Sequence, residues 1–397
     1  MWSRFLQYLQ CPECSGLLEL HPFGTSTESI SEEFLQLARS RGISSHDLSQ
    51  WIENGVLQCH ACEVTFPIWH GLPILLPYTT TAHQHFRAES EKEMGQLKQV
   101  YPFPNREPVS GERFVLDSFS KEWLEYDFDG VIWTASYDDY RETFLREVGY
   151  TEGETAESYL EVGCGIGITA SIAQQTFGGD ALGIDLSLAA MKACGHWRAN
   201  PFMQFVQASA FYLPVRKARF DLVYSRGALH HTYSTKEAFS CVAERCKPGG
   251  RTYLWVYGSE SINQNLFRKS AYATEAVFRP ILSKDPCSLT STVCLSAFAS
   301  AYVGFNSLRR LRNPHMQHYT FRRAMHAARD RFTPQFAHRH ESQEVEGWFR
   351  QTGFDDVASL DWKQMPAAEQ ENFKRNIGIL GWRKQGSDGS LAPANIS

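Results

Sequence analysis

An apolar segment that ends in three alternating glycines constrains this chain more than any other feature of its sequence. Residues 159–162 form a strand-like run, and a helix-forming run starts at residue 170. Between them, Gly163, Gly165 and Gly167 occupy every second position. Glycine allows positive φ angles and lets a ligand come closer to the backbone than a Cβ atom would permit. The sequence therefore predicts a strand that turns directly into a helix, with a ligand bound at the turn.

The residues around this turn leave two classes of ligand open. A second strand ends at Asp185, about twenty residues on, where such folds place an acid against ribose hydroxyls. The glycine spacing also satisfies a loose dinucleotide fingerprint, so a nicotinamide or flavin enzyme is one alternative. The second class is a ligand that carries ammonium and sulfonium groups. Glu161 favours this class, because an acid beside the glycines would repel a pyrophosphate but attract such a cation.

The order of the later elements favours one α/β fold. The expected elements after Asp185 are strands at 205–210, 220–225 and 251–257 (the last after a turn at 246–250), a helix at 342–352, and strands at 356–360 and 376–382. The last two strands would form an antiparallel hairpin at the edge of a parallel sheet. Such an edge separates this fold from dinucleotide-binding folds.

At this point the sequence resembles the class I S-adenosylmethionine-dependent methyltransferases that act on small molecules. The matching segments are Glu161-x-Gly163-x-Gly165-x-Gly167, Asp185, Leu213-Pro214, Phe220-Asp221-Leu222-Val223, Ala228-Leu229-His230-His231 and Lys247-Pro248-Gly249-Gly250. The resemblance implies a Rossmann-like sheet of seven strands whose last hairpin is antiparallel. It also implies S-adenosylmethionine as the cofactor.

The resemblance assigns roles to the residues of a cofactor site. The three glycines would provide the close backbone approach, Glu161 would lie near the amino-acid end of the cofactor, and Asp185 would bind the ribose. The full set that it implies is Glu161, Gly163, Cys164, Gly165, Gly167, Asp185, Leu186, Ser209, Ala210, Ser225 and Arg226. The family usually has an acid near the adenine amino group, where this chain has Ser209. We therefore expect a weaker or altered contact with adenine.

Two adjacent histidines follow the fourth core strand. If the methyl acceptor is a hydroxyl group, a base must take its proton, and the pKa of histidine suits that task. His230 and His231 are the nearest candidates along the sequence. The alternative is that this pair only shapes the cofactor loop through backbone contacts.

Two Cys-x-x-Cys pairs stand near the beginning of the chain. Cys11 and Cys14 form the first pair, and Cys59 and Cys62 form the second. Four thiolates in two such pairs are typical of a structural Zn²⁺ site, which leaves no open coordination position for a substrate. A redox dithiol is the alternative for either pair. The other six cysteines are scattered, and we expect them to be small buried apolar residues without a catalytic role.

The segment around these pairs resembles the small zinc-binding activator subunit that partners several RNA and protein methyltransferases. Helices expected at residues 30–40 and 47–54 separate the two pairs, and residues 66–77 resemble the end of that subunit. Finding activator and catalyst in one chain predicts that the zinc ribbon packs on the methyltransferase sheet, so that no separate activator subunit is needed.

Six regions are predicted along the chain. They are a zinc-ribbon module (1–80), a linker and aromatic cap (81–140), the methyltransferase core (141–257), a helical insert (258–341), the end of the core (342–384) and a flexible tail (385–397). In the cap, Phe119, Trp123, Tyr126 and Trp133 either cover the cofactor or only pack together. The insert would face the substrate.

The insert carries a cluster of basic residues. Seven arginines and three histidines lie between residues 309 and 331, in a segment almost empty of acids. Arginine binds carboxylate and phosphate groups bidentately, so an anionic acceptor is predicted. The alternatives are a solvated helix face that acids elsewhere neutralise, or a surface that contacts an RNA backbone.

Composition narrows the class of protein further. The 397 residues carry a net charge of −5, which gives no overall electrostatic attraction for nucleic acid. With no apolar run of signal-peptide or membrane-span length, a soluble, cytoplasmic protein is expected.

The leading hypothesis is therefore an enzyme that methylates a small molecule such as a carbohydrate, a quinone-like metabolite or a natural product. RNA or protein methylation is the second hypothesis, although residues 225–228 lack the Asn/Asp-Pro-Pro-Tyr arrangement that holds a planar nitrogen acceptor. A cofactor-binding relic without activity is the third.

Overall fold

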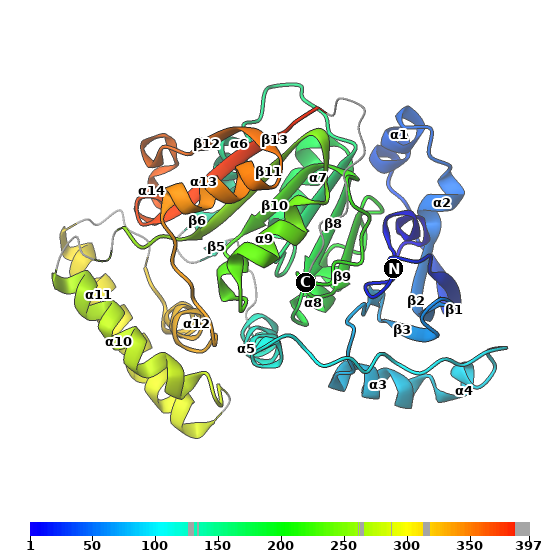
Figure 1. The fold of residues 1–397 in the computed structure, drawn as a ribbon, viewed down its shortest axis with the longest axis horizontal. Coiled ribbons are helices and arrows are strands. Elements are labelled where there is room, and N and C mark those ends of the chain that lie inside the picture. Colours follow the sequence, from blue (N-terminus) through cyan, green and yellow to red (C-terminus); the bar gives the residue numbers. More distant parts are fainter. Residues whose placement is uncertain are drawn as a thin grey trace.

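The computed structural model describes residues 1–125, 131–132, 135–260, 262, 266–286, 288–312 and 318–385. Tyr126, Trp133, Cys287, part of the basic segment and the predicted tail from residue 386 lie outside the described residues. The described chain forms a seven-stranded sheet with helices around it, a separate four-stranded sheet at the N-terminus, and a group of helices beyond one end of the large sheet (Figure 1). Within the described ranges, no helix is long and apolar enough to cross a membrane.

The seven-stranded sheet confirms the predicted α/β class. Its strands are β7 (Ser158–Val162), β8 (Asp180–Asp185), β9 (Met203–Gln207), β10 (Phe220–Arg226), β11 (Cys246–Tyr257), β12 (Phe354–Ser359) and β13 (Asn376–Arg383), in the order β12-β13-β11-β10-β7-β8-β9. Strands β7 to β11 are parallel, and β13 is antiparallel to both β11 and β12. The last two strands therefore make the predicted antiparallel edge.

Both faces of the sheet are buried, as the apolar composition of its parallel strands requires. The helices that surround it are α6 (Tyr137–Glu147), α7 (Ile168–Phe177), α8 (Ala189–His196), α9 (Thr235–Ala243), α13 (Ser342–Gln351) and α14 (Ala367–Phe373). Side chains of β10 alternate between the two layers: Leu222 and Tyr224 pack with α7, while Val223 packs with α9 and the N-terminal module. This alternation follows from the two-residue period of a strand.

The N-terminal module has its own antiparallel sheet. Its elements are η1 (Ser3–Tyr8), β1 (Glu19–Thr27), α1 (Glu32–Ser40), α2 (Ser45–Ser49), β2 (Gln50–Cys59), β3 (Val64–Trp69) and β4 (Leu72–Pro73). The helix predicted at residues 47–54 is wrong beyond Ser49, because Trp51 and Ile52 are buried in β2, where they pair with β1. Helices α3 (Thr81–Glu89), α4 (Glu91–Met94) and α5 (Glu112–Glu125) and the short strands β5 (Val131–Ile132) and β6 (Ala135–Ser136) lead into the core.

The structure differs from the sequence-based expectations at two further places. Residues 246–250, expected as a turn, begin β11: Phe220 pairs with Cys246 and Leu222 with Arg251, so the intervening Lys-Pro-Gly-Gly forms an irregularity within the strand. Helix α14, between the last two strands, was not expected at all. Its short length gives only two helical turns, too few for a clear apolar period.

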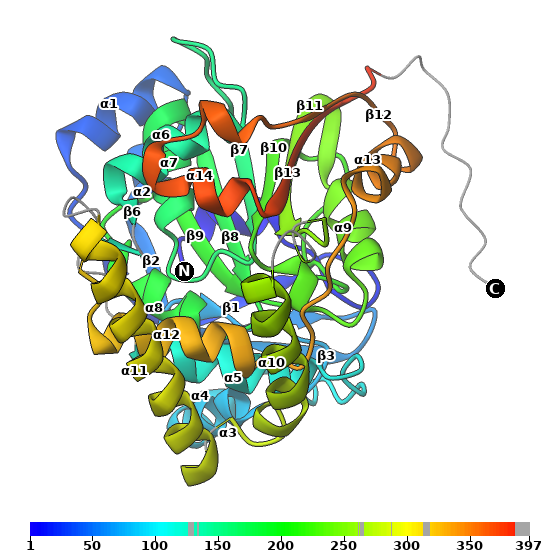
Figure 2. The same ribbon diagram turned by 90° about the vertical axis from the view of Figure 1, so that its left-hand side faces the viewer.

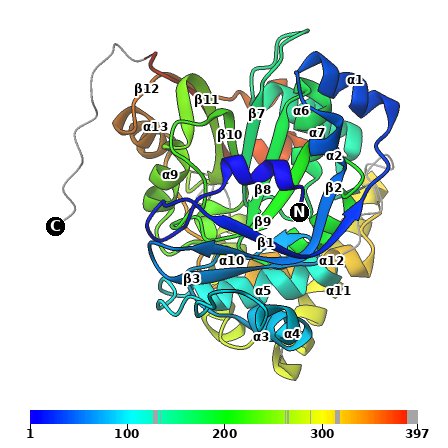
Figure 3. The ribbon, with the colours of Figure 1, turned by 90° about the vertical axis from the view of Figure 1, so that its right-hand side faces the viewer.

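The N-terminal module packs directly on the core sheet. Ile74 pairs in parallel with Gln207 at the edge strand β9, and the Leu75 amide donates to the Gln207 carbonyl at 2.8 Å. Side chains of η1, including Phe5 and Tyr8, belong to the same buried cluster as core residues Leu160 and Ile184. Figure 3 shows η1 and the strands of the module lying across the core sheet. Packing of the ribbon on the sheet within one chain is therefore observed.

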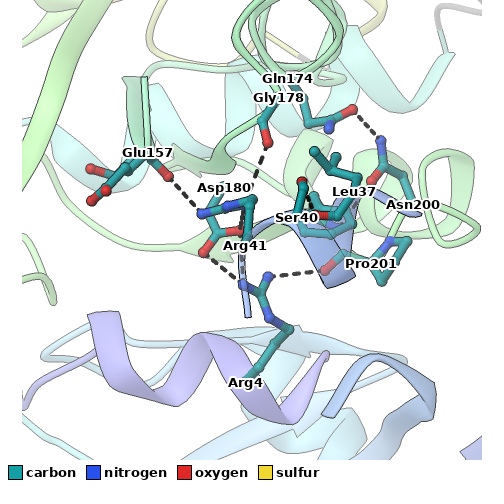
Figure 4. A network of polar contacts seen from close by, with 12 residues as sticks. Arg4, Leu37, Ser40, Arg41, Glu157, Gln174, Gly178, Asp180, Asn200 and Pro201 are labelled. Atoms are coloured by element: carbon teal, nitrogen blue, oxygen red, sulfur yellow. Dashed lines mark hydrogen bonds and ion pairs between the residues drawn. The ribbon is translucent and has the colours of Figure 1, made fainter. Parts of the chain in front are cut away.

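Asp180, at the start of β8, anchors this interface (Figure 4). It accepts hydrogen bonds from Arg4 at 2.8 and 2.9 Å, from the Tyr8 hydroxyl at 2.7 Å and from Arg41 at 3.0 Å. The side chain of Asp180 is 2% exposed and that of Arg4 is 6% exposed. Three residues of the N-terminal module thus converge on one buried carboxylate of the core.

Replacing Asp180 with asparagine is expected to lower the free energy of unfolding by about 3–5 kcal/mol, since it leaves buried arginine without its charge partner. Urea unfolding followed by circular dichroism measures the change. Glu32→Ala is the matched control, because its ion pair with Arg39 has side chains that are 61% and 68% exposed and should contribute less than about 1 kcal/mol. Equal changes in the two variants would contradict a structural role for the buried network.

Candidate active site and metal centre

A cavity of about 730 Å³ opens at the carboxyl ends of the parallel strands. Its wall combines the glycine loop after β7, the ends of β8, β9 and β10, helix α5, and helices α10 (Leu266–Leu282), α11 (Leu289–Arg312) and α12 (Phe321–Phe332) of the insert. Figure 2 shows these insert helices in front of α5, below the end of the sheet. The volume lies within the range of small-molecule sites.

The glycine loop fits closely between neighbouring elements. Gly163 has a φ of 84°, and a Cβ atom there would lie 2.1 Å from the Cβ of Ala228. Gly165 lines the cavity, and so does Trp123, whose ring lies beside it. The Gly165 amide donates a hydrogen bond to the Asp185 carboxylate at 2.8 Å. Gly167 does not line the cavity: it is the N-cap residue of α7, and it packs on the Phe205 ring. The third glycine therefore serves packing in this structure.

Two carboxyl groups lie at this loop: that of Glu161 is buried, and that of Asp185 is half-buried. Asp185 accepts from Gly165 and from the amide and hydroxyl of Ser187, at 2.7 to 2.8 Å. Burial raises its pKa, and these hydrogen bonds partly offset the effect. Burial, with the nearby Asp185 charge, raises the pKa of Glu161 well above its usual value, and its Oε2 has no hydrogen-bond partner among the described residues. A cationic ligand group would stabilise the charged form of Glu161.

The structure separates the eleven predicted cofactor residues into two groups. Those that line the cavity are Glu161, Gly163, Cys164, Gly165, Asp185, Leu186, Ala210 and Arg226. Those that lie behind its wall are Gly167, Ser209 and Ser225. The Ser209 hydroxyl accepts from the Phe211 amide at 3.2 Å, and the Ser225 hydroxyl donates to the Val162 carbonyl at 2.8 Å.

Arg226 lines the cavity, but its charge is already neutralised. Its guanidinium contacts Glu147 at 3.2 Å and Glu369 at 2.5 Å. Glu369 belongs to α14, the helix that the sequence pattern did not indicate. Arg226 therefore joins the last part of the chain to the end of β10, and its charge is shared between two buried acids.

The two candidate bases differ in position. His231 lines the cavity, and its Nδ1 lies 2.7 Å from the Phe336 carbonyl oxygen. A carbonyl can only accept, so Nδ1 carries the proton and Nε2 keeps its lone pair, with no partner among the described residues. His230 does not line the cavity: its ring lies on Tyr257, with 3.8 Å between the ring centres.

Aromatic residues of the cap cover the glycine loop. Phe119 and Trp123 of α5 line the cavity, and the Trp123 ring lies beside Gly165. The Ser120 hydroxyl of the same helix accepts from the Leu188 amide at 3.0 Å. Helix α5 is therefore held directly over the end of β8.

Acids that the basic segment lacks come from another helix. Glu275 of α10 binds Arg279 at 2.6 Å, Arg331 at 3.0 Å and Arg339 at 2.8 Å. Of these three arginines, Arg331 belongs to the basic segment of residues 309–331, while Arg279 and Arg339 lie outside it. Arg309 also lines the cavity, and no acid among the described residues pairs with it. It lies 5.9 Å from the centre of the Phe305 ring.

The four paired cysteines converge in the N-terminal module. The sulfur atoms of Cys11, Cys14, Cys59 and Cys62 all lie within 4.8 Å of one another. Cys14 and Cys59 are 3.5 Å apart, and Cys11 and Cys62 are 4.0 Å apart. A tetrahedral Zn²⁺ with bonds of about 2.3 Å places its sulfur ligands roughly 3.8 Å apart. The donor set and its spacing therefore fit a structural zinc ion.

The sheet order and the glycine loop define the class I methyltransferase fold. Residues 160–254 match the family model for a methyltransferase domain. The chain therefore contains a methyltransferase domain, joined to a zinc-ribbon-like cysteine cluster. This match covers β7 to β11, the part of the core that carries the glycine loop and Asp185.

Comparison with known proteins identifies similar chains. Phosphoethanolamine N-methyltransferase 2 of Caenorhabditis elegans is 29% identical over 145 residues, which are 36% of this chain and 32% of that protein. The chain thus spans about a third of this curated relative. A solved phosphoethanolamine N-methyltransferase 2 of Haemonchus contortus is 17% identical with a TM-score of 0.42, covering 71% of this chain and 62% of that one.

A second solved structure belongs to a complex that contains the Trm112 methyltransferase activator of Haloferax volcanii. One chain of that complex is 14% identical to this protein, with a TM-score of 0.42. The likeness covers 69% of this chain and all of that chain.

Proposed function

We propose that this protein transfers a methyl group from S-adenosylmethionine to a small, anionic molecule. The observation that carries the proposal is the single cavity that joins the glycine loop to the insert. One end has the residues that the class I fold uses for a sulfonium nucleoside. The other end has aromatic side chains and a cation. A cofactor and an acceptor could therefore meet within one enclosed space.

The cofactor end matches the chemistry of S-adenosylmethionine group by group. Glu161, a buried carboxyl without a partner for Oε2, suits the ammonium of its amino-acid part. Asp185 already holds the glycine loop and retains acceptor capacity for ribose hydroxyls. The bound cofactor would supply an activated methyl group. The close contacts around Gly163 leave no room for a side chain at the turn itself.

The acceptor end supports a small anion. Tyr272, Tyr302 and Tyr319 of the insert line the cavity. Arg309 is the cavity cation for which the described residues provide no ion pair, so it could bind a carboxylate or phosphate. The relative from Caenorhabditis elegans acts, by its name, on phosphoethanolamine, a small molecule with a phosphate group. The same chemistry would suit a phosphorylated or carboxylated metabolite here.

For a hydroxyl acceptor we propose His231 as the base. The oxygen lone pair would form the new C–O bond as the methyl–sulfur bond breaks and its electrons return to sulfur, while the hydroxyl proton moves to Nε2. Burial lowers the pKa of His231 to about 3, so the ring is neutral at physiological pH. A weak base is sufficient, because the proton becomes strongly acidic as the new bond forms.

His231→Ala is expected to lower kcat by about 100-fold on a hydroxyl acceptor, within the usual range for a lost general base. Affinity for S-adenosylmethionine should stay within about threefold. The matched comparison is His230→Ala, which removes a neighbouring buried ring that does not line the cavity. Initial-rate kinetics and calorimetry measure the two quantities. A larger loss of kcat in the His230 variant would contradict the assignment.

The experiment that tests the proposed function is calorimetric titration of the zinc-loaded protein with S-adenosylmethionine and, separately, with NADH. We expect micromolar binding of the first alone. Transfer of the labelled methyl group to a panel of phosphorylated and carboxylated small molecules would then identify the acceptor. Binding of neither nucleotide would favour a relic domain, and labelling of co-purified RNA would favour the RNA hypothesis.

We also propose that the cysteine cluster holds structural zinc and that its module replaces a separate activator. The module already covers the edge strand β9 through residues 74–75. With four sulfur ligands the metal has no free position for a substrate. Its role would be to hold the module against the core.

A further inference from the structure

The end of β9 presents no acid of its own to the cavity. Ser209, which follows this strand, is fully buried behind the wall, and its hydroxyl oxygen accepts a hydrogen bond from the Phe211 amide. Ala208 and Ala210, on either side, line the cavity with methyl groups. A nucleoside base bound here would therefore find no hydrogen-bonding side chain at residues 208–210, the end of β9.

Glu112 fills this gap from another part of the chain. It is the first residue of α5, it is 6% exposed, and it lines the cavity. Its carboxyl lies near the hydroxyls of Ser209 and Tyr78, which partly offset the rise that burial causes in the Glu112 pKa. The second carboxyl oxygen, Oε2, is buried and has no hydrogen-bond partner among the described residues. A buried acceptor left in this state is unfavourable unless a ligand donates to it.

The position of Glu112 is set by contacts along the start of α5. The amide of Glu112 donates to the Val109 carbonyl at 2.9 Å. Gly111, with a φ of 73°, lies so close to Gln335 that a Cβ atom would be 2.4 Å from its Oε1. Further along the helix, the hydroxyls of Ser118 and Thr333 are 2.6 Å apart. Helix α5 is thus fixed against the segment that follows α12, and Glu112 cannot easily turn to solvent.

From this arrangement we infer that Glu112 recognises the amino group of the adenine ring, in place of the acid that is missing at Ser209. The inference rests on the proposed function, since it takes the cofactor to be an adenine nucleoside. Glu112 acts here as a specificity-determining residue for the cofactor and takes no part in methyl transfer.

The chemistry of a carboxyl group suits this task in either protonation state. The adenine amino group has two N–H donors, and a carboxyl oxygen accepts one of them whether the group is ionised or neutral. Burial raises the pKa of Glu112, so the neutral form persists to higher pH than for an exposed glutamate. The neutral form would in addition donate its O–H to a ring nitrogen of adenine.

The test compares two ligands, S-adenosylhomocysteine and its 6-deamino analogue, whose purine lacks the amino group. The unmodified, zinc-loaded protein should bind the first at least about tenfold more tightly, the usual effect of one hydrogen bond to a buried carboxyl. Isothermal titration calorimetry measures both affinities. In the Glu112→Leu variant, the affinities for the two ligands should differ by no more than about twofold.

Two further variants make the result specific. Glu107→Leu is the matched control, because it makes the same change at an exposed glutamate five positions earlier and should keep the wild-type ratio. Adding Ser209→Asp to Glu112→Leu should restore discrimination, since it returns a carboxyl to the end of β9.

The outcomes separate the inference from the proposed function. If the unmodified protein binds both ligands equally, the inference is overturned while the proposed function stands, and this comparison needs no variant to fold. A ratio unchanged in a folded Glu112→Leu protein overturns it as well. Failure of the unmodified protein to bind S-adenosylhomocysteine overturns the proposed function, and the inference with it.

Discussion

Asp185→Ala is expected to weaken S-adenosylmethionine binding by about 100-fold or more. The carboxylate would contribute hydrogen bonds to the ribose hydroxyls, and each such bond to a charged group is worth roughly 1.5–3 kcal/mol. It also holds Gly165 at 2.8 Å and the Ser187 amide at 2.8 Å, so the glycine loop should loosen when it is removed. Calorimetric titration of the variant with S-adenosylmethionine measures the loss.

Asp221→Ala is the matched control for this prediction. Asp221 lies in the same sheet but near the start of β10, where it accepts from the Ser158 amide at 3.0 Å and pairs with Lys247. Its removal should leave the affinity within about twofold. Thermal unfolding would show that both variants are folded. A folded Asp185→Ala protein with wild-type affinity would contradict the assigned ribose contact.

Replacing both Cys11 and Cys59 with serine is expected to make the protein insoluble, rather than to slow a chemical step. Structural zinc contributes roughly 10–16 kcal/mol to folding in small zinc modules, which is comparable to the whole stability of a domain. Without it, the apolar side chains of η1 would leave the face of the core sheet that they share with Leu160. The soluble fraction after expression and the zinc content by mass spectrometry measure the effect.

Cys241→Ser is the control, because this half-buried cysteine belongs to the core and lies outside the cluster. It should remain soluble and should bind zinc at the wild-type level. If the double variant is instead soluble and still binds S-adenosylmethionine, the module does not stabilise the core in the way proposed.

The two sites depend on each other through the fold. The module reaches the core at β9, and its connection through α3 and α4 leads to α5, which covers the cofactor end of the cavity. Tyr78, near the end of the module, lies close to Glu112. Loss of zinc should therefore disturb the proposed adenine contact as well as the stability of the sheet. A separate activator subunit could not position α5 through chain continuity in this way.

Local sequence patterns were sufficient to predict those elements that depend on a few consecutive residues. Strands β7, β8 and β10 were expected within one or two residues, because an apolar run between turn residues is a feature of a few consecutive positions. The two Cys-x-x-Cys pairs likewise indicated a four-sulfur cluster. Residues 50–54 were assigned to a helix incorrectly, since their burial depends on pairing with β1, a contact that local spacing does not reveal.

The sequence by itself determined the α/β class, the glycine loop with Asp185, and the four cysteines of the candidate metal centre. Only the tertiary structure decided which of the two histidines lines the cavity, that Glu369 pairs with Arg226, and that Glu275 pairs with Arg331. It also placed Glu112 beside Ser209, 97 positions away in a different element. The reason is physical. Periodicity shows which face of a helix or strand is apolar, whereas these partners meet because separate elements pack together. A local sequence pattern does not show which distant elements will be in contact.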